Sequence, residues 1–495
     1  MFVMSLKGVP TGQLVEDKLC LFKYRQNVSY CLQLAKMTEM EDTVGLKLPI
    51  LTEMTKLTLY ATLILTIPSI LASLFIGAWT DRYQPAKKIL LIVGAVCGAV
   101  DAVANMLNVY YYDSSAYYIL LPPITMIFSG GMLGLLTSFW AYIALTTPRK
   151  WLAIRMTIAE VMMSIASPVG TYIGGAVLNT NPLWANSGQL HNYMGVYMIC
   201  GVVYLLATIW TLFMIDERKD MEAFQRDFGS INGEEEDMSL REEMANKQKQ
   251  YDDNRHIHPI RLLFNCRNVK DMFTTCCKRR TNYVRLQLWL LFVSMAIFVI
   301  AFMGPIVFLY SFVQIIYKWD SQMFSNISAA GSFISIGAVF FVTPILIKVL
   351  RFKDTTLSLI GLAAFGGQNL LRGIILNPIG YYLSMPVGAM AAMATIGIRS
   401  HFSKIVEPRE LGKVSSLMAA IDSVMPLIGS AFYTSVFNAT IHSNPGLSFI
   451  ITGALMSVPF AVMIWIHFFT VLPDFQSRAI EVDINSNDES NEERI

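Results

Sequence analysis

Long, uninterrupted apolar blocks are the feature that most constrains how this chain can fold. Several of them exceed the roughly 18 residues that mark a candidate membrane-spanning helix. Charged residues make up only 15% of the chain, whereas soluble domains carry about 25%. A water-soluble core could not hide so many blocks of this length. The sequence therefore predicts an all-α, multi-pass integral membrane protein.

The apolar blocks predict eleven full spanning helices. They cover residues 57–79, 88–111, 117–145, 151–178, 193–215, 286–313, 323–349, 355–376, 379–403, 411–436 and 446–471. The opening stretch from Phe2 to Val15 is only weakly apolar. It is too short to span at about 1.5 Å per residue. We interpret it as the second half of a first helix that is incomplete.

The distribution of Lys and Arg predicts which loops face the cytosol. One alternate set of short loops carries the basic residues, among them Arg82, Arg149, Arg351 and Lys404, and cytosolic loops are enriched in such residues. By this rule the hydrophilic linker at 216–285 and the acidic tail at 473–495 are cytosolic. The linker separates an N-terminal half, 1–215, from a C-terminal half of six helices, 286–472. Restoring the first helix gives two six-helix halves.

The segment before the helix at 57–79 then lies on the outer face, where disulfides persist. Cys20 and Cys31 both fall in it. A disulfide between them is one reading, and two free thiols are the other. Asn27, in Asn27-Val28-Ser29, matches a glycosylation acceptor with room for a glycan.

A short motif joins the helix at 57–79 to the next one. Gly77, Asp81 and Arg82 in "GAWTDRYQPAKK" match the Gly-x-x-x-Asp-Arg part of the cytosolic signature of the major facilitator superfamily, which the chain resembles. That resemblance implies two six-helix halves around a midplane site. It also implies that these three residues form a conformational latch. The alternative is an ordinary basic turn.

Two further stretches narrow the resemblance. "RMTIAE" (Arg155–Glu160) and "RSHFSKIVEPRELGKVSSLMA" (Arg399–Ala419) are similar to segments of the proton-coupled folate transporter and haem carrier family. The outer "EDKLC" is similar to its insect-type branch. The resemblance implies a proton-coupling role for Glu160. It also implies a substrate and proton role for Arg399, for which snorkelling to the membrane surface is the alternative.

Ionisable residues inside predicted spans cost about 2.5–3.5 kcal/mol each on insertion scales and are often functional. We therefore add Asp101 and Asp422 to Glu160 as proton-coupling candidates, with structural hydrogen bonding between helices as the alternative. Aromatic side chains on helices expected to line the path could stack on a planar organic anion, with core packing as the alternative. These are Trp140, Tyr142, Tyr310 and Phe312.

The sequence thus predicts a proton-coupled secondary transporter for an organic anion or similar solute, working by alternating access. A uniporter or exchanger without proton coupling is one alternative, and a non-transporting receptor or truncated regulatory isoform is another. We find no nucleophile–base set, metal-ligand spacing, cofactor motif or nucleic-acid-binding pattern in the sequence. The expected partners are the solute, protons and lipid. The expected location is the plasma membrane or the lysosomal membrane, and the oligomeric state is left open.

Overall fold

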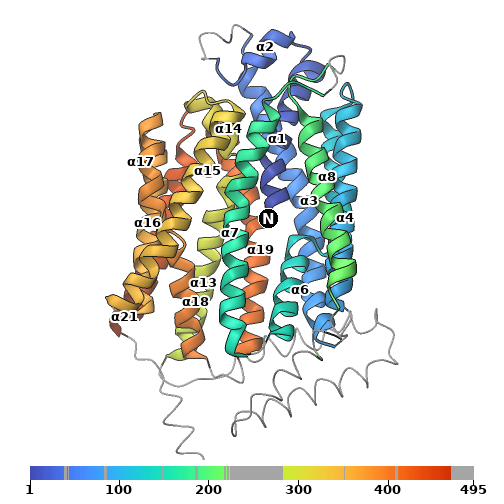
Figure 1. Cartoon of the computed structure of the whole chain (residues 1–495). Coiled ribbons are helices and arrows are strands. Elements are labelled where there is room, and N and C mark those ends of the chain that lie inside the picture. Colours follow the sequence, from blue (N-terminus) through green and yellow to red (C-terminus); the bar gives the residue numbers. More distant parts are fainter. Residues whose placement is uncertain are drawn as a thin grey trace, which may run out of the picture.

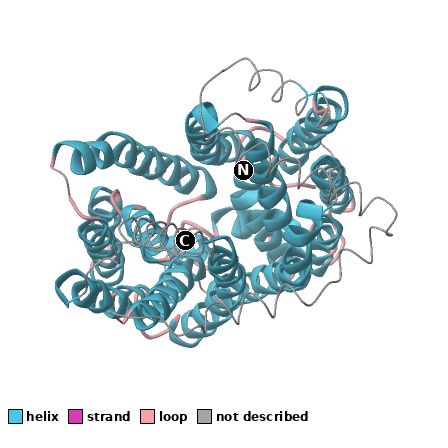
Figure 2. Ribbon diagram, turned by 90° about the horizontal axis from the view of Figure 1, so that it is seen from below, coloured by secondary structure: helices cyan, strands magenta, loops and turns pink. Residues whose placement is uncertain are grey.

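The computed structural model describes residues 1–37, 42, 44–82, 86–147, 149–183, 188–216, 219, 222, 283–350, 352–406 and 411–469. Every regular element in these ranges is helical. The long helices stand side by side in one bundle, with α2 (Val28–Gln33) above it in Figure 1. Figure 2 looks along the bundle from the opposite end. We call the end that carries α2 the outer end, following the Lys and Arg distribution.

The N-terminal half begins with α1 (Phe2–Lys18), which starts midway along the bundle and rises to the outer end (Figure 1). A short π-helical turn, η1 (Leu19–Lys23), continues it. The remaining elements of this half are α3 (Lys47–Arg82), α4 (Ala86–Tyr110), η2 (Ala116–Leu120), α5 (Pro122–Met126), η3 (Ile127–Ser129), α6 (Gly131–Thr146), α7 (Arg149–Leu178) and α8 (Tyr193–Met214).

The C-terminal half is more segmented. It comprises α13 (Val284–Met303), η4 (Gly304–Val307), α14 (Leu309–Ile316), α15 (Ser321–Gly337), η5 (Ala338–Val342), η6 (Ile345–Val349), α16 (Asp354–Ile374), α17 (Pro378–Gly388), α18 (Met393–Ile405), α19 (Leu411–Thr440), α20 (Leu447–Leu455) and α21 (Ser457–Phe469). In the residues that the structure describes, each of the eleven predicted ranges is mostly helical.

Nine helical stretches among the described residues are long and apolar enough to cross a membrane. They account for the predicted spans except 355–376 and 411–436. Those two form α16, of 21 residues, and α19, of 30 residues. The predicted helix 117–145 is broken near its middle, where Gly130 and Gly131 have φ of 71° and 63°. Glycine takes such angles without the steric cost of a Cβ atom.

Glycines let α7 pack tightly on both sides. A Cβ atom at Gly170 or Gly174 would overlap the backbone carbonyls of Phe2 and Leu6 in α1. A Cβ atom at Gly175 would overlap the Ser325 side chain of α15, in the other half. Small residues at helix interfaces allow this close approach. The glycines of α7 therefore bring it close to α1 in its own half and to α15 in the other half.

Candidate transport site

Arg399 and Asp422, which the sequence singled out for separate roles, form an ion pair. Nη2 of Arg399, on α18, donates to Oδ2 of Asp422, on α19, at 2.6 Å. The arginine side chain is 57% exposed and the aspartate side chain 24% exposed. The second carboxylate oxygen, Oδ1 of Asp422, is buried and has no hydrogen-bond partner among the described residues. The pair thus joins an accessible guanidinium to a carboxylate that is only partly satisfied.

Asp101 is also paired. It is 1% exposed on α4, and it accepts an ion pair from Lys7 on α1. The amide of Asn105 donates to the backbone carbonyl of Asp101 at 2.9 Å. The ion pair therefore joins α1 to α4 within the N-terminal half. Sequence reasoning missed Lys7, because the short opening stretch gave no indication of what that lysine would face.

Glu160 lies on an exposed face of α7. Within the described part of the chain its carboxylate makes no hydrogen bond or ion pair. Arg155, five residues earlier, donates to the carbonyl of Thr146 at 3.3 Å and to the hydroxyl of Thr147 at 3.0 Å. The structure therefore does not pair Arg155 with Glu160, and it leaves the Glu160 carboxylate accessible.

The four aromatic candidates fall into two groups. Trp140 and Tyr142 are partly buried on α6, and Trp140 packs edge-on against Phe139. Phe312 is fully buried on α14 within the aromatic core, and Tyr310 beside it is 8% exposed. Phe312 is therefore packed in the hydrophobic core.

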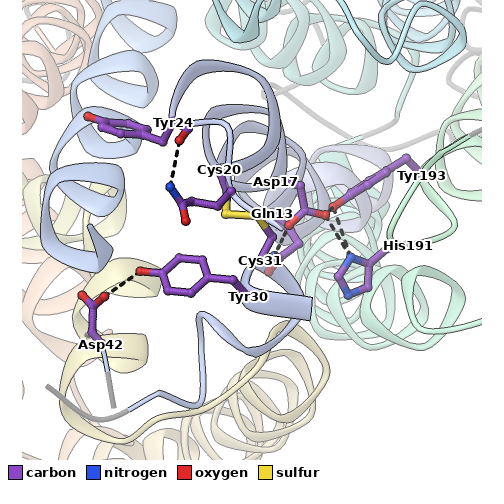
Figure 3. Close-up of a disulfide and its surroundings, with 10 residues drawn as sticks. Gln13, Asp17, Cys20, Tyr24, Tyr30, Cys31, Asp42, His191 and Tyr193 are labelled. Carbon is purple, nitrogen blue, oxygen red and sulfur yellow. Dashed lines mark hydrogen bonds and ion pairs between the residues drawn. A yellow bond between two sulfur atoms is a disulfide. The ribbon is translucent and has the colours of Figure 1, made fainter. Parts of the chain in front are cut away.

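An outer-end network centres on Asp17 of α1 (Figure 3). Its carboxylate accepts hydrogen bonds from Gln13 at 2.9 Å, from His191 at 3.1 Å and from the hydroxyl of Tyr193. His191 lies in the loop before α8. Burial opposes charge on its imidazole, but the hydrogen bond to Asp17 and that carboxylate's charge together raise the pKa of His191 above its ordinary value.

Further polar contacts join the two halves near the same end. Gln314 donates to Glu16 at 2.7 Å, Thr55 donates to Asn438 at 2.8 Å, and the hydroxyl of Tyr310 donates to Gln13. Sequence reasoning missed Glu16 and Gln314. The run of three charged residues at 16–18, directly after an apolar stretch, was the available signal. Gln314, the partner of Glu16, lies 298 residues further along the chain.

The remaining predicted sites lie at the ends of the bundle. Cys20 and Cys31 form a disulfide in the outer segment (Figure 3). Asn27, between them, is exposed at the start of α2, and its glycosylation remains a prediction. The latch candidates are Gly77, Asp81 and Arg82, at the cytosolic end of α3. Their surroundings lie outside the described part of the structure.

The described residues contain no group of three His, Cys, Asp or Glu side chains that could hold a metal ion. The chemistry that they offer is that of carboxylates, amides and basic side chains. Such groups can bind protons and anions.

Residues 49–430 match the profile of the Major Facilitator Superfamily. The proton-coupled folate transporter of Bos taurus is 23% identical over 441 residues, 86% of this chain and 83% of that protein. The probable peptidoglycan muropeptide transporter SLC46 of Drosophila melanogaster is 22% identical over 194 residues. That match spans 38% of this chain and only 37% of the fly protein.

Solved structures share the fold at low sequence identity. The xylose transporter XylE from E. coli, in an inward open conformation, superposes with a TM-score of 0.56 at 14% identity, covering 96% of each chain. A peptide transporter POT mutant in complex with sulfate gives a TM-score of 0.56 at 12% identity, covering 93% of this chain and 94% of the other.

Proposed function

The chain belongs to the major facilitator superfamily, and from this premise we propose that it is a proton-coupled transporter that moves an organic anion by alternating access. As a member of this family it is a multi-pass membrane transporter and not an enzyme. The proposal adds the coupling ion, the class of solute and the residues that link them.

The observation that carries the proposal is the pairing of Arg399 with Asp422. A guanidinium offers five N–H donors in a planar fork that suits a carboxylate or phosphate. Asp422 engages Nη2 of Arg399, and the arginine is 57% exposed. A solute anion that takes both prongs of the fork must therefore compete with Asp422.

Protonation of Asp422 removes this competition. The neutral acid holds the guanidinium more weakly, so Arg399 becomes free to bind the anion. When the anion leaves, Asp422 loses its proton and pairs with Arg399 again. One proton and one anionic group then bind together and leave together, which is symport. Glu160, accessible and without a partner in the described residues, is a second candidate for carrying the proton.

The relatives suggest which anions to test. They are named for folate, for a peptidoglycan muropeptide, and, in Gallus gallus, for a lysosomal steroid conjugate and bile acid symporter that is 24% identical over 114 residues. We propose that the solute of this chain belongs to the same broad class. A plasma-membrane or a lysosomal location would each place the outer end toward the compartment that supplies protons.

The test is uptake by the full chain reconstituted in lipid vesicles. Radiolabelled folate, a muropeptide and a steroid sulfate are each supplied outside, at equal pH and with the outside acidified. We expect one of them to accumulate faster with the acid outside, and a protonophore to abolish the gain. Uptake that ignores the gradient would support the uniporter or exchanger. No uptake of any anion would support the receptor.

A further inference from the structure

Glu16 and Gln314 form a buried contact between the two halves at the outer end. Glu16 lies on α1 and is 1% exposed. Gln314 lies on α14 and is fully buried. Nε2 of Gln314 donates to Oε2 of Glu16 at 2.7 Å. Oε1 of Glu16 and Oε1 of Gln314 are both buried, and neither has a hydrogen-bond partner among the described residues.

These two unpartnered atoms are both acceptors when Glu16 is ionised. Burying an acceptor without a donor costs about 1–3 kcal/mol, and more for a charged group. A single hydrogen on Oε1 of Glu16 supplies the missing donor. A carboxylic acid and a primary amide can then exchange two hydrogen bonds, N–H to one carboxyl oxygen and O–H to the amide oxygen. One proton thereby satisfies both orphan atoms.

The neighbouring carboxylate favours the neutral form of Glu16. Asp17, next in the chain, already accepts hydrogen bonds from Gln13, His191 and Tyr193. Within the part of the chain that the structure describes, Glu16 accepts only the hydrogen bond from Gln314. When two buried carboxyl groups adjoin, the one with fewer donors is the one that keeps a proton.

Other charged and titratable groups face Glu16 from the helices packed against it. His191, in the loop before α8, favours the ionised form of Glu16 when its imidazole is protonated, and Lys47, on α3, favours it by its charge. Its ammonium, however, donates to the backbone carbonyls of Ala35, Met37 and Gln314. Tyr310, on α14, donates to Gln13. None of these three groups donates a hydrogen bond to Glu16.

We propose, as an extension of the proposed transport function, that Glu16 is a further proton-binding site. It takes a proton from the outer compartment. As a neutral acid it pairs with Gln314 and holds the outer ends of the two halves together. Loss of the proton leaves a charge that requires water, so the outer end opens. Because the proton binds the closed form more tightly, acid on the outer side favours closure.

The experiment measures the outer end directly, without any solute. Spin labels are placed at two exposed outer positions, Tyr118 before α5 and Ile379 in α17, with the free cysteines replaced by serine. Their separation is measured by electron spin resonance at pH 5.5 and pH 7.5 in lipid nanodiscs. We expect the ratio of closed to open populations to rise on acidification, by no more than about tenfold per pH unit for one proton.

Glu16→Gln mimics the protonated acid, since its amide donates where the acid hydroxyl would. We expect this variant to stay closed at both pH values. The exchanged pair Glu16→Gln with Gln314→Glu restores one acid facing one amide, and we expect the pH response to return. Tyr310→Phe removes a neighbouring hydrogen bond between the halves that involves no carboxylate, and it should weaken closure equally at both pH values.

Two results would overturn the proposal. One is a Glu16→Gln protein that still closes only in acid, with His191→Gln abolishing the response instead. The other is a Glu16→Gln protein that is open at both pH values, which would mean that the ionised carboxylate holds the ends together. Gradient-driven uptake with either result would leave the transport function standing, because the labels report closure and not transport.

Discussion

Lys7 of α1 forms an ion pair with Asp101 of α4, and the aspartate is almost completely buried. The pair ties the first helix of the bundle to its neighbour in the same half. A buried charge that loses its partner costs about 3–5 kcal/mol, whereas replacing both partners by neutral groups is often close to neutral. The single substitution of Lys7 and the double substitution of both partners should therefore differ in stability.

We expect Lys7→Met to lower the unfolding midpoint of the purified protein in detergent, because it strands the Asp101 carboxylate. Lys7→Met combined with Asp101→Leu should recover most of the loss. Lys56→Met is the control, since Lys56 is an exposed lysine of α3. A double substitution as unstable as the single one would show that the pair is not the source of the effect.

Arg399 and Asp422 should respond differently to substitution. Arg399→Lys keeps the charge and loses the planar fork, so we expect surface expression to persist while the apparent KM for the anion rises. Arg399→Ala should raise it further, by about ten- to a hundredfold, as expected when a hydrogen bond to a charged group worth about 1.5–3 kcal/mol is lost. Normal affinity in both proteins would leave Arg399 as a snorkelling side chain.

Asp422→Asn should keep anion binding and lose its pH dependence. The amide cannot ionise, so it holds Arg399 weakly at every pH and the anion binds without a proton. Initial uptake rates measured from pH 5.5 to pH 8 should therefore be flat in this variant. An uptake rate that depends on pH as in the unmodified protein would show that another residue carries the coupling proton.

Glu160→Gln tests the other candidate carrier. A carboxylate that lies on an exposed face, with no partner among the described residues, can gain and lose a proton as the halves move. We expect the substitution to abolish uptake driven by a pH gradient and to preserve solute exchange at equal pH. Glu53→Gln is the matched control, because the Glu53 carboxylate is held at the outer end by Lys23 and Tyr117. Loss of both activities in Glu160→Gln would indicate a structural role.

His191 gives the fold its own dependence on pH. Its pKa is raised in the folded protein because, against the effect of burial, the Asp17 carboxylate stabilises the imidazolium. A raised pKa means that the stabilisation is complete below the unfolded value, about 6.5, and is lost as the pH rises through the folded value. We expect the unfolding midpoint to fall over that window, and His191→Gln to flatten the curve. A midpoint that rises with pH would contradict this assignment.

The helices were predictable because each depends on local composition. Where the structure describes them, the eleven predicted ranges are mostly helical, since an apolar run in a membrane must satisfy its backbone hydrogen bonds internally. Breaks within the ranges, such as the one at Gly130 and Gly131, were not predicted. They depend on backbone angles that a hydropathy pattern does not encode.

The pairing of side chains was less predictable. Asp422 was visible as a costly residue in apolar surroundings, and Arg399 through the family resemblance, but nothing in the sequence joined them. Lys7, Glu16 and Gln314 drew no attention, because their meaning lies in contacts between distant segments. A glutamine in an apolar helix looks neutral until the carboxylate that it faces is known.

Gly175 has a consequence for how substitutions at the outer end behave. Its missing side chain is what allows α7 to meet Ser325 of the opposite half. A methyl group at this position would overlap the Ser325 side chain and push the two halves apart where they now touch. Alanine is the mildest replacement in most helices, but at this position it would favour a conformation that is open toward the outer compartment.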